Sequence, residues 1–325
     1  MAKQQQKAEV LELCGVEIAP GASMEINLST AKLHTQTQID VPIIIERSKL
    51  EGPTVLFTAG IHGDEVNGIE VVRQLIAKGI NKPKIGTVIC IPIVNIFGFI
   101  QKSREFPDGR DLNRVFPGSR KGSLASQFAY QLTNEIMPHI DYCLDFHTGG
   151  SSRFNIPHIR TTGKDPKQNK LAEVFNAPFI LQSKNIKKSF RSYCEKNGIT
   201  LLLFEGGKSN SIDNIVSNTG VNGAKRVLSQ LGMLRSKFKV SSPKKKSVVI
   251  TQSRWLRAST SGMFKPAVKA GEKVPVGHVL GHITDPYGKV HYWIRANSSG
   301  YVINVNEAPI VYQGDALFHI STKNQ

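Results

Sequence analysis

Between residues 54 and 231, short apolar runs alternate with longer segments whose apolar residues recur every three or four positions. The run Thr54–Ala59 is long enough for a buried strand and too short for a helix. A segment from about Glu65 to Lys78 follows it and carries its apolar residues on one helical face. The same pattern predicts strands at Thr87–Ile93, Tyr142–His147 and Ile199–Phe204, and helices at Ser123–Ile136 and about Asp213–Leu231. This alternation favours an α/β layer fold around a buried, mostly parallel sheet.

The composition changes on both sides of this region. Residues 1–46 have the pattern of short strands separated by turns, and we expect them to pack on an α/β domain of residues 47–234. Residues 235–247 contain six Lys or Arg residues and one proline, which is typical of a basic linker.

Residues 248–325 contain a half-repeat, in which pairs of glycines lie 15 residues apart (262 and 277) and 14 residues apart (300 and 314). Two β units of this size predict a small all-β domain, a barrel or sandwich. The segment resembles a biotinyl/lipoyl-type domain but lacks the Met-Lys-Met turn that carries a prosthetic group. We therefore expect a structural module.

Charge, hydropathy and cysteine spacing exclude several classes of protein. The formal net charge is +17, but the cations are spread along the chain, which favours attraction of a small anionic substrate over nucleic-acid binding. The longest apolar stretch, Val88–Ile100, is interrupted by Pro92 and Asn95 and is shorter than the roughly 18 residues of a membrane span. The polar N-terminus has no signal-peptide pattern, and the four cysteines form no CxxC pair. These features predict a cytoplasmic protein with reduced thiols and no membrane partner.

Three metal-binding residue types stand at predicted strand ends. His62 and Glu65 lie three residues apart where the first strand turns into a helix, and His147 ends the third strand. If the strands are parallel, these side chains meet at the carboxyl edge of the sheet, where open α/β sheets bind ligands. Two histidines and one glutamate, with a fourth position left to water, make a catalytic zinc set.

Two further carboxylates belong to the same edge. Asp145 is on the same side of its strand as His147 and can hold that imidazole from behind the metal, although a solvent-facing aspartate is an equal alternative. Glu205 follows the apolar fourth strand, where it can accept a proton from zinc-bound water and pass it to a leaving nitrogen. The alternative for Glu205 is a solvated residue at a strand end.

The loop after the second strand is rich in cationic side chains. It contains three arginines, Arg104, Arg110 and Arg114, together with Asn113 in a Gly/Pro-rich context. Guanidinium groups bind carboxylates through paired hydrogen bonds. The loop therefore indicates a carboxylate-binding site, with solvated surface charges as the alternative.

Four blocks together resemble the succinylglutamate desuccinylase/aspartoacylase family of the zinc-carboxypeptidase superfamily: Gly-Ile-His-Gly-Asp-Glu, Asp-Leu-Asn-Arg-Val-Phe-Pro-Gly, Asp-Phe-His-Thr and Phe-Glu-Gly-Gly. Their order and spacing agree over roughly residues 50–235. The resemblance implies a three-layer α/β/α sandwich with a mostly parallel mixed sheet, followed by the small C-terminal β domain. It also implies one zinc ion per chain, with His62, Glu65 and His147 as ligands and Glu205 as general base and acid.

The family resemblance assigns the loop residues too. It implies that Asn113 and Arg114 bind a substrate carboxylate and that an arginine upstream polarises the scissile carbonyl. We favour Arg104 for that role, because Arg110 lies inside the turn that leads to Asn113, although either is available. The family also uses a tyrosine from the C-terminal domain. Tyr312 is the available candidate here.

These observations predict a zinc-dependent amidohydrolase that cleaves a linear amide in a small, anionic N-acyl amino acid or related acylated amine. One alternative is a zinc carboxypeptidase that acts on short peptides. Another is a non-catalytic protein that binds anions in the basic cleft. A homo-oligomer is compatible with each.

Overall fold

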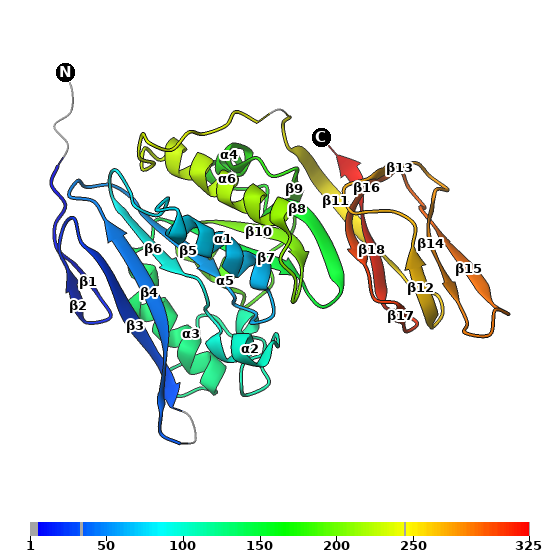
Figure 1. The fold of residues 1–325 in the computed structure, drawn as a ribbon, viewed down its shortest axis with the longest axis horizontal. Helices are drawn as coiled ribbons and strands as arrows, with labels where there is room; N and C mark the ends of the chain where they lie inside the picture. The colour runs from blue at the N-terminus through cyan, green and yellow to red at the C-terminus, as the bar shows by residue number, and fades with distance from the viewer. Residues whose placement is uncertain (1–5, 33–34, 244, 325) are drawn as a thin grey trace.

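A twelve-stranded sheet runs through the computed structural model, which describes residues 6–32, 35–243 and 245–324 (Figure 1). In spatial order its strands are β13 (Lys273–Val274), β16 (Gly300–Asn306), β18 (Ala316–Asn324), β11 (Val248–Arg257), β9 (Phe179–Gln182), β8 (Arg153–Thr161), β10 (Thr200–Lys208), β7 (Tyr142–Gly149), β5 (Thr54–Ala59), β6 (Thr87–Ile91), β4 (Gln38–Arg47) and β3 (Ser23–Lys32).

The four strands expected from the apolar runs form the parallel centre of this sheet. β10, β7, β5 and β6 pair in parallel, so their carboxyl ends lie at one edge. β8 and β4 flank this centre and are antiparallel to β10 and β6, which makes the sheet mixed. β8 and β9, which pair in parallel with each other, are not among the strands that the sequence pattern predicts.

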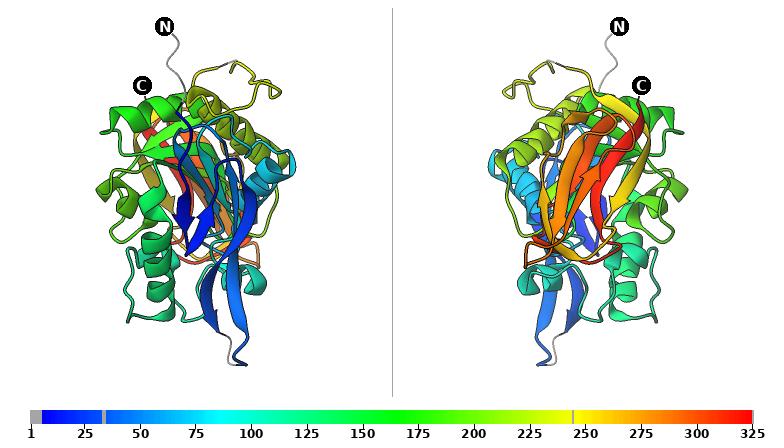
Figure 2. Two further views of the ribbon diagram at one scale, coloured as in Figure 1. Left: turned by 90° about the vertical axis from the view of Figure 1, so that its left-hand side faces the viewer. Right: turned by 90° about the vertical axis from the view of Figure 1, so that its right-hand side faces the viewer.

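Helices cover both faces of the sheet (Figure 2). Side chains of β5 alternate between the two cores: Val55 and Phe57 pack in one and Leu56 in the other. The first core includes residues of α1 (Val66–Ala77), α4 (Pro166–Phe175) and α6 (Asn214–Gln230). The second includes residues of α3 (Leu124–Glu135) and α5 (Phe190–Lys196). The arrangement is therefore three-layered, with α2 (Ile96–Gln101) and the 3₁₀ turns Leu112–Arg114 and Met137–His139 in the connections.

The N-terminal strands extend one end of the molecule. β1 (Leu11–Leu13) and β2 (Val16–Ile18) form a short hairpin, whereas β3 and β4 are ten residues each and longer than the sequence pattern predicts. β4 continues the central sheet by pairing with β6. Leu13 and Ile18 pack in the same core as α3, so this segment covers one face of the central layer.

The C-terminal strands form a two-sheet sandwich, and one of its sheets is the end of the twelve-stranded sheet that contains β13, β16, β18 and β11. The described part of the basic segment 235–247 contains no helix or strand, and β11 begins at Val248. A second sheet consists of β15 (His291–Arg295), β14 (Val279–Thr284), β12 (Gly262–Pro266) and β17 (Ile310–Val311). A separate apolar core fills the sandwich.

This unit is not separate in its hydrogen bonding. β11 pairs with β9 and β16 pairs with β8, so strands after the linker continue the sheet of the α/β part. Consequently, β16 lies near the carboxyl edge of that sheet, since its Asn304 pairs with Asn155 of β8, which in turn pairs with Gly207 at the end of β10.

Membrane-spanning helices and the state of the cysteines are the two remaining features of the fold that the sequence bears on. Within the described residues, no helix is both long enough and apolar enough to cross a bilayer. All four cysteines are free thiols; Cys90, Cys143 and Cys194 are buried, and Cys14 is half-buried.

Candidate metal and catalytic site

The predicted metal ligands meet at the carboxyl edge of the parallel strands. His62 lies in the turn after β5, Glu65 immediately precedes α1, and His147 is near the end of β7. This turn is compact because Gly60 adopts a φ of +63°, a conformation that favours glycine, and because Gly63 packs against the backbone of α2. A Cβ atom on Gly63 would lie 1.9 Å from a backbone carbon of α2. Local backbone geometry thus turns His62 and Glu65 toward β7.

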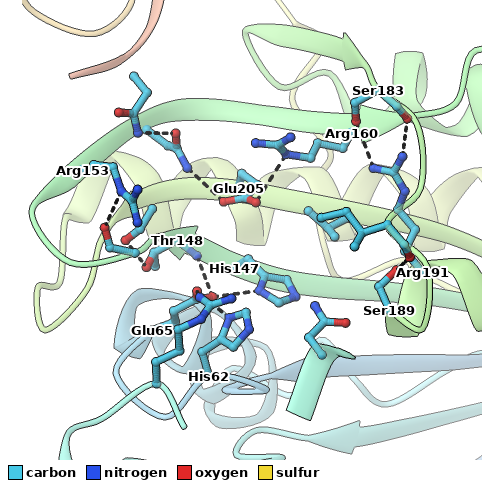
Figure 3. A pocket seen from close by; sticks show the side chains of 18 of the residues that line it. His62, Glu65, His147, Thr148, Arg153, Arg160, Ser183, Ser189, Arg191 and Glu205 are labelled. Atoms are coloured by element: carbon cyan, nitrogen blue, oxygen red, sulfur yellow. Dashed lines mark hydrogen bonds and ion pairs between the residues drawn. The ribbon is translucent and has the colours of Figure 1, made fainter. Parts of the chain in front are cut away.

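The three side chains converge on one another (Figure 3). Glu65 Oε1 lies 2.7 Å from His62 Nδ1, and Glu65 Oε2 lies 2.8 Å from His147 Nδ1. One ligand atom from each residue falls within 4.8 Å of the other two. All three residues are at most 3% exposed. Glu65 makes no capping hydrogen bond to α1, since its carboxylate is committed to the two imidazoles and to the backbone N–H of Thr148.

Each imidazole has a second carboxylate on its outer nitrogen. His147 Nε2 lies 2.8 Å from Asp145 Oδ2, and Asp145 Oδ1 accepts a hydrogen bond from Thr58. Asp145 is 1% exposed, so the alternative of a solvent-facing aspartate is wrong. His62 Nε2 lies 3.2 Å from Asp111 Oδ1, a contact that the sequence analysis does not predict. Carboxylates in this position fix the ring orientation of metal-binding histidines.

The electrostatics of the group favour positive charge at its centre. Burial lowers the pKa of His147, but the carboxylates of Asp145 and Glu65 more than offset this and raise that pKa well above its usual range. Burial raises the pKa of Glu65, but His62 and His147 outweigh it and hold that pKa well below its ordinary value. The pKa of Asp111 is lowered as well: burial raises it, but His62 and Arg104 outweigh burial and hold it below its ordinary value. The centre is thus surrounded by ionised carboxylates.

This donor set suits a metal ion. Two Nδ1 atoms and one carboxylate face a common point, and both outer nitrogens are held by carboxylates, as in catalytic zinc centres. The described residues His62, Glu65 and His147 can therefore hold a divalent cation.

Glu205 projects from β10 beside this group, in the strand position paired with His147. Its Oε2 accepts a hydrogen bond of 2.9 Å from Asn155 Nδ2, and its Oε1 lies 3.3 Å from Arg160 Nε. Burial raises the pKa of Glu205, although Arg160 and His147 oppose that effect. A carboxylate with a raised pKa is suited to accept and return a proton near neutral pH.

One cavity of about 230 Å³ joins these groups. His62, Glu65, His147 and Glu205 line it together with Asn113 and six cationic residues: Arg104, Arg114, Arg153, Arg160, Lys184 and Arg191. Asn113 Oδ1 accepts from the backbone N–H of Phe190, so its amide group is oriented by α5. Burial, together with Arg160, lowers the pKa of Arg191 to about 10, which leaves it charged at neutral pH.

The structure brings Arg104 to the cavity and keeps Arg110 out. Arg104 donates to Asp111 Oδ2 at 2.8 Å through Nη2 and to Glu65 Oε1 at 3.4 Å through Nη1. The Arg110 side chain is 59% exposed, lies in the turn closed by the Phe106 N–H to Arg110 carbonyl bond, and does not line the cavity. The expectation that Arg110 binds substrate is therefore not supported.

Tyr312 also lies outside the cavity. It follows the two-residue strand β17 and is 74% exposed. The C-terminal strands instead contribute Trp255 from β11 and Asn304 from β16. Trp255 stacks on His319 with ring centroids 4.6 Å apart. The expected tyrosine therefore does not line the cavity, whereas Trp255 and Asn304 from the same part of the chain do.

Several cavity residues come from elements that the sequence pattern does not reveal: Arg153, Asn155 and Arg160 from β8, Arg191 from α5, Trp255 from β11 and Asn304 from β16. Asp111, unlike these residues, belongs to one of the four sequence blocks, Asp-Leu-Asn-Arg-Val-Phe-Pro-Gly, of which it is the first residue. Its role as the cap of the 3₁₀ turn Leu112–Arg114 was a readable signal.

A known family of proteins matches the part of the chain that contains His62, Glu65, His147 and Glu205. The model of the succinylglutamate desuccinylase/aspartoacylase catalytic domain matches residues 51–231. An N-alpha-acetyl-L-2,4-diaminobutyric acid deacetylase from Halomonas elongata is 26% identical over 259 residues, which cover 75% of this chain and 74% of that protein.

Solved structures share the fold. A succinylglutamate desuccinylase/aspartoacylase from Rhodobacter sphaeroides superposes with a TM-score of 0.81 at 24% identity, covering 97% of this chain and all of that one. The product-bound ectoine utilization protein EutE (DoeB) from Ruegeria pomeroyi gives 0.83 at 21% identity, covering 98% and 100%. With its catalytic-domain match spanning more than half of its length, the chain belongs to the succinylglutamate desuccinylase/aspartoacylase family.

Proposed function

We propose that this protein is a zinc-dependent hydrolase that cleaves the amide bond of a small N-acyl amino acid carrying more than one carboxylate. Family membership supports a hydrolase that acts on acylated amino acids, as does the deacetylase name of the Halomonas relative. The observation that carries the proposal is the convergence of His62, Glu65 and His147 beside Glu205 in one cavity.

The chain's residues divide the chemistry among them. Zinc held by His62, Glu65 and His147 would supply a Lewis acid and an activated water. Glu205 accepts the proton of the attacking water at its carboxylate and then delivers it to the leaving nitrogen. Asp145 and Asp111 accept hydrogen bonds from the Nε2 atoms of the two imidazoles, which would leave each Nδ1 free to bind the metal.

Arginines and Asn113 handle the charges of the substrate. Arg104 faces Glu65 from a fixed position on Asp111, where its guanidinium meets negative charge that develops on the carbonyl oxygen. Arg114 and the Asn113 amide group line the cavity and bind a carboxylate. A residue that polarises the carbonyl is thus distinct from those that anchor the substrate.

The charge balance of the cavity indicates the substrate class. Among the described lining residues there are six Lys or Arg side chains and only two carboxylates, Glu65 and Glu205, both already engaged in the chemistry. No carboxylate remains to pair with a cationic side chain such as that of diaminobutyrate. Burial lowers the pKa of Arg191 and the charge of Arg160 lowers it further, so a second substrate anion that pairs with these cavity-lining arginines would relieve their repulsion. This favours acylated aspartate, glutamate or a dicarboxylic acyl group over the diamino compound named for the relative.

The size of the cavity favours a small substrate over a peptide. The space that Trp255 and Asn304 help to line has a volume of about 230 Å³. Residence in the cytoplasm and assembly into a homo-oligomer stay predictions from the sequence.

A substrate panel tests the proposal. The zinc-loaded protein is mixed with N-acetyl and N-succinyl derivatives of aspartate, glutamate, alanine and diaminobutyrate, and with dipeptides, while free amine is measured. We expect the dicarboxylic derivatives to be cleaved with at least about tenfold higher kcat/KM, one buried ion contact being worth that much. Preference for the diamino compound or for dipeptides would overturn the substrate class. Absence of hydrolysis throughout would overturn the function.

A further inference from the structure

A chain of two buried amides connects the C-terminal strands to Glu205. Asn304 on β16 is 2% exposed, and its Nδ2 donates to Asn155 Oδ1 at 2.7 Å. Asn155 on β8 is 5% exposed, and its Nδ2 donates to Glu205 Oε2 at 2.9 Å. The dashed lines that reach Glu205 in Figure 3 include this contact.

Strand pairing brings Asn304 opposite Asn155 and places Asn155 opposite a position two residues from Glu205 along β10. Asn304 is opposite Asn155 in the antiparallel β16–β8 ladder. Asn155 is opposite Gly207 in the β8–β10 ladder, whose register shifts between Glu205 and Gly207. Asn304 of the C-terminal segment is thereby connected to Glu205, the proposed general base, through the side chain of Asn155 alone.

The chemistry of the carboxylate fixes the direction of this chain. Ionised Glu205 only accepts hydrogen bonds, so Asn155 must present its NH₂ group to it. The carbonyl oxygen of Asn155 then points to Asn304, which must present an NH₂ group in turn. If Asn155 were rotated by half a turn about its side-chain amide, its oxygen would face the Glu205 carboxylate and repel it.

The other neighbour of Glu205 does not impose such an orientation. Arg160 Nε lies 3.3 Å from Glu205 Oε1, but this buried nitrogen has no hydrogen-bond partner, so its N–H is not directed at the carboxylate. Its positive charge attracts Glu205 without fixing the angle of the carboxylate. Among the described contacts, the directed side-chain hydrogen bond to Glu205 comes from Asn155.

We propose that Asn155 and Asn304 are positioning residues of the reaction: Asn304 fixes the orientation of the Asn155 amide, and Asn155 fixes the Glu205 carboxylate. The C-terminal β segment thus takes part in catalysis by orienting the base. This inference rests on the proposed function, since it takes Glu205 as the general base.

Kinetics of four variants test the relay. Asn155→Ala, Asn304→Ala and the double variant should each lower kcat by about 10- to 100-fold, the usual loss when a supporting hydrogen bond at a catalytic group is removed. KM and zinc content should stay within about twofold of the wild type. The double variant should be no slower than Asn155→Ala, because Asn304 acts only through Asn155. Asn304→Leu retains apolar packing without a donor, and it should be as slow as Asn304→Ala.

Asn306→Ala is the matched control. Asn306 lies two residues further along β16, is 8% exposed and bonds to the backbone of Ala316 and Ala308 without lining the cavity. It should lower the melting temperature while leaving kcat unchanged. A purely structural role for Asn304 would make Asn304→Leu faster than Asn304→Ala and would make the Asn306 control equally slow.

The outcomes separate the relay from the proposed function. If the wild type hydrolyses its substrate and Asn304→Ala keeps the wild-type kcat, the relay is wrong and the function stands. If no panel substrate is hydrolysed, the proposed function fails, and the relay is judged by unfolding free energies of the two single variants and the double variant. Non-additive losses would support coupled amides, and additive losses would overturn them.

Discussion

Replacing Asp111 by asparagine should weaken both the proposed metal site and the position of Arg104, the proposed carbonyl-binding arginine. Asp111 Oδ1 contacts His62 Nε2 at 3.2 Å, while Oδ2 accepts from Arg104 Nη2 at 2.8 Å and Nε at 3.2 Å. Asparagine can keep one oxygen for His62, but its NH₂ group then faces the Arg104 guanidinium, donor against donor. One substitution therefore removes a negative charge from two partners.

The expected size of each effect follows from these contacts. Loss of a carboxylate behind a metal-binding histidine lowers metal affinity by about 10- to 100-fold, or about 1.4–2.8 kcal/mol. Arg104 loses its paired anchor, so kcat at saturating zinc should fall by up to the 10²–10³-fold typical of one lost oxyanion donor, or about 2.7–4 kcal/mol. A drop in both quantities distinguishes Asp111 from a residue that serves only the metal.

The assay measures zinc dissociation by competition with a chromophoric chelator and kcat at saturating zinc. Asp108→Asn is the control: it lies in the same loop, and its contacts are with the backbone N–H groups of Arg110 and Ala125 and with the Arg110 side chain. The proposed double role of Asp111 would be refuted if Asp111→Asn matched Asp108→Asn in both zinc affinity and kcat.

Three further variants or sets of variants test the account. Glu205→Gln should retain zinc and lose at least about 10² in kcat, because an amide cannot accept the proton; loss of zinc measured by elemental analysis would instead make Glu205 a ligand. Arg114→Ala should mainly raise KM and Arg104→Ala mainly lower kcat, whereas exposed Arg110→Ala should change neither in steady-state kinetics; a kcat defect confined to Arg110→Ala would reverse the assignment. Burial, reinforced by Arg160, lowers the pKa of His319 to about 3. The unfolded state therefore binds more protons than the folded state between about pH 3 and 6.5. The free energy of unfolding consequently falls as the pH falls through that window. His319→Gln should flatten the slope of unfolding free energy there by up to about 1.4 kcal/mol per pH unit, and an unchanged slope in denaturant titrations would contradict the shift.

The convergence of the candidate metal ligands could be predicted from the sequence because the strand-end rule needs only local information. Apolar runs located β5, β7 and β10, and parallel pairing then brought His62, Glu65, His147 and Glu205 to one edge. Side-chain alternation along β7 put Asp145 on the same side as His147, but it left a solvent-facing aspartate as an equal alternative, which the burial of Asp145 excludes.

The remaining wall of the cavity depends on pairings that local patterns do not encode. β8 carries Pro157 and several polar residues, so it does not have the composition of a central strand, and Asn155 and Arg160 were missed with it. Trp255 and Asn304 reach the site only because β11 and β16 pair with β9 and β8 across more than 60 residues of sequence. Tyr312, the candidate tyrosine, follows the end of β17 at Val311 and is exposed, so it does not reach the cavity.

A zinc titration of the metal-free protein, followed by hydrolysis of the best panel substrate, tests the central claim most directly. With His62, Glu65 and His147 forming a single catalytic centre, activity should rise linearly with added zinc and level off at about one equivalent per chain, one such ligand set holding one ion. Full activity in the chelator-treated protein before any zinc is added would contradict the proposed mechanism.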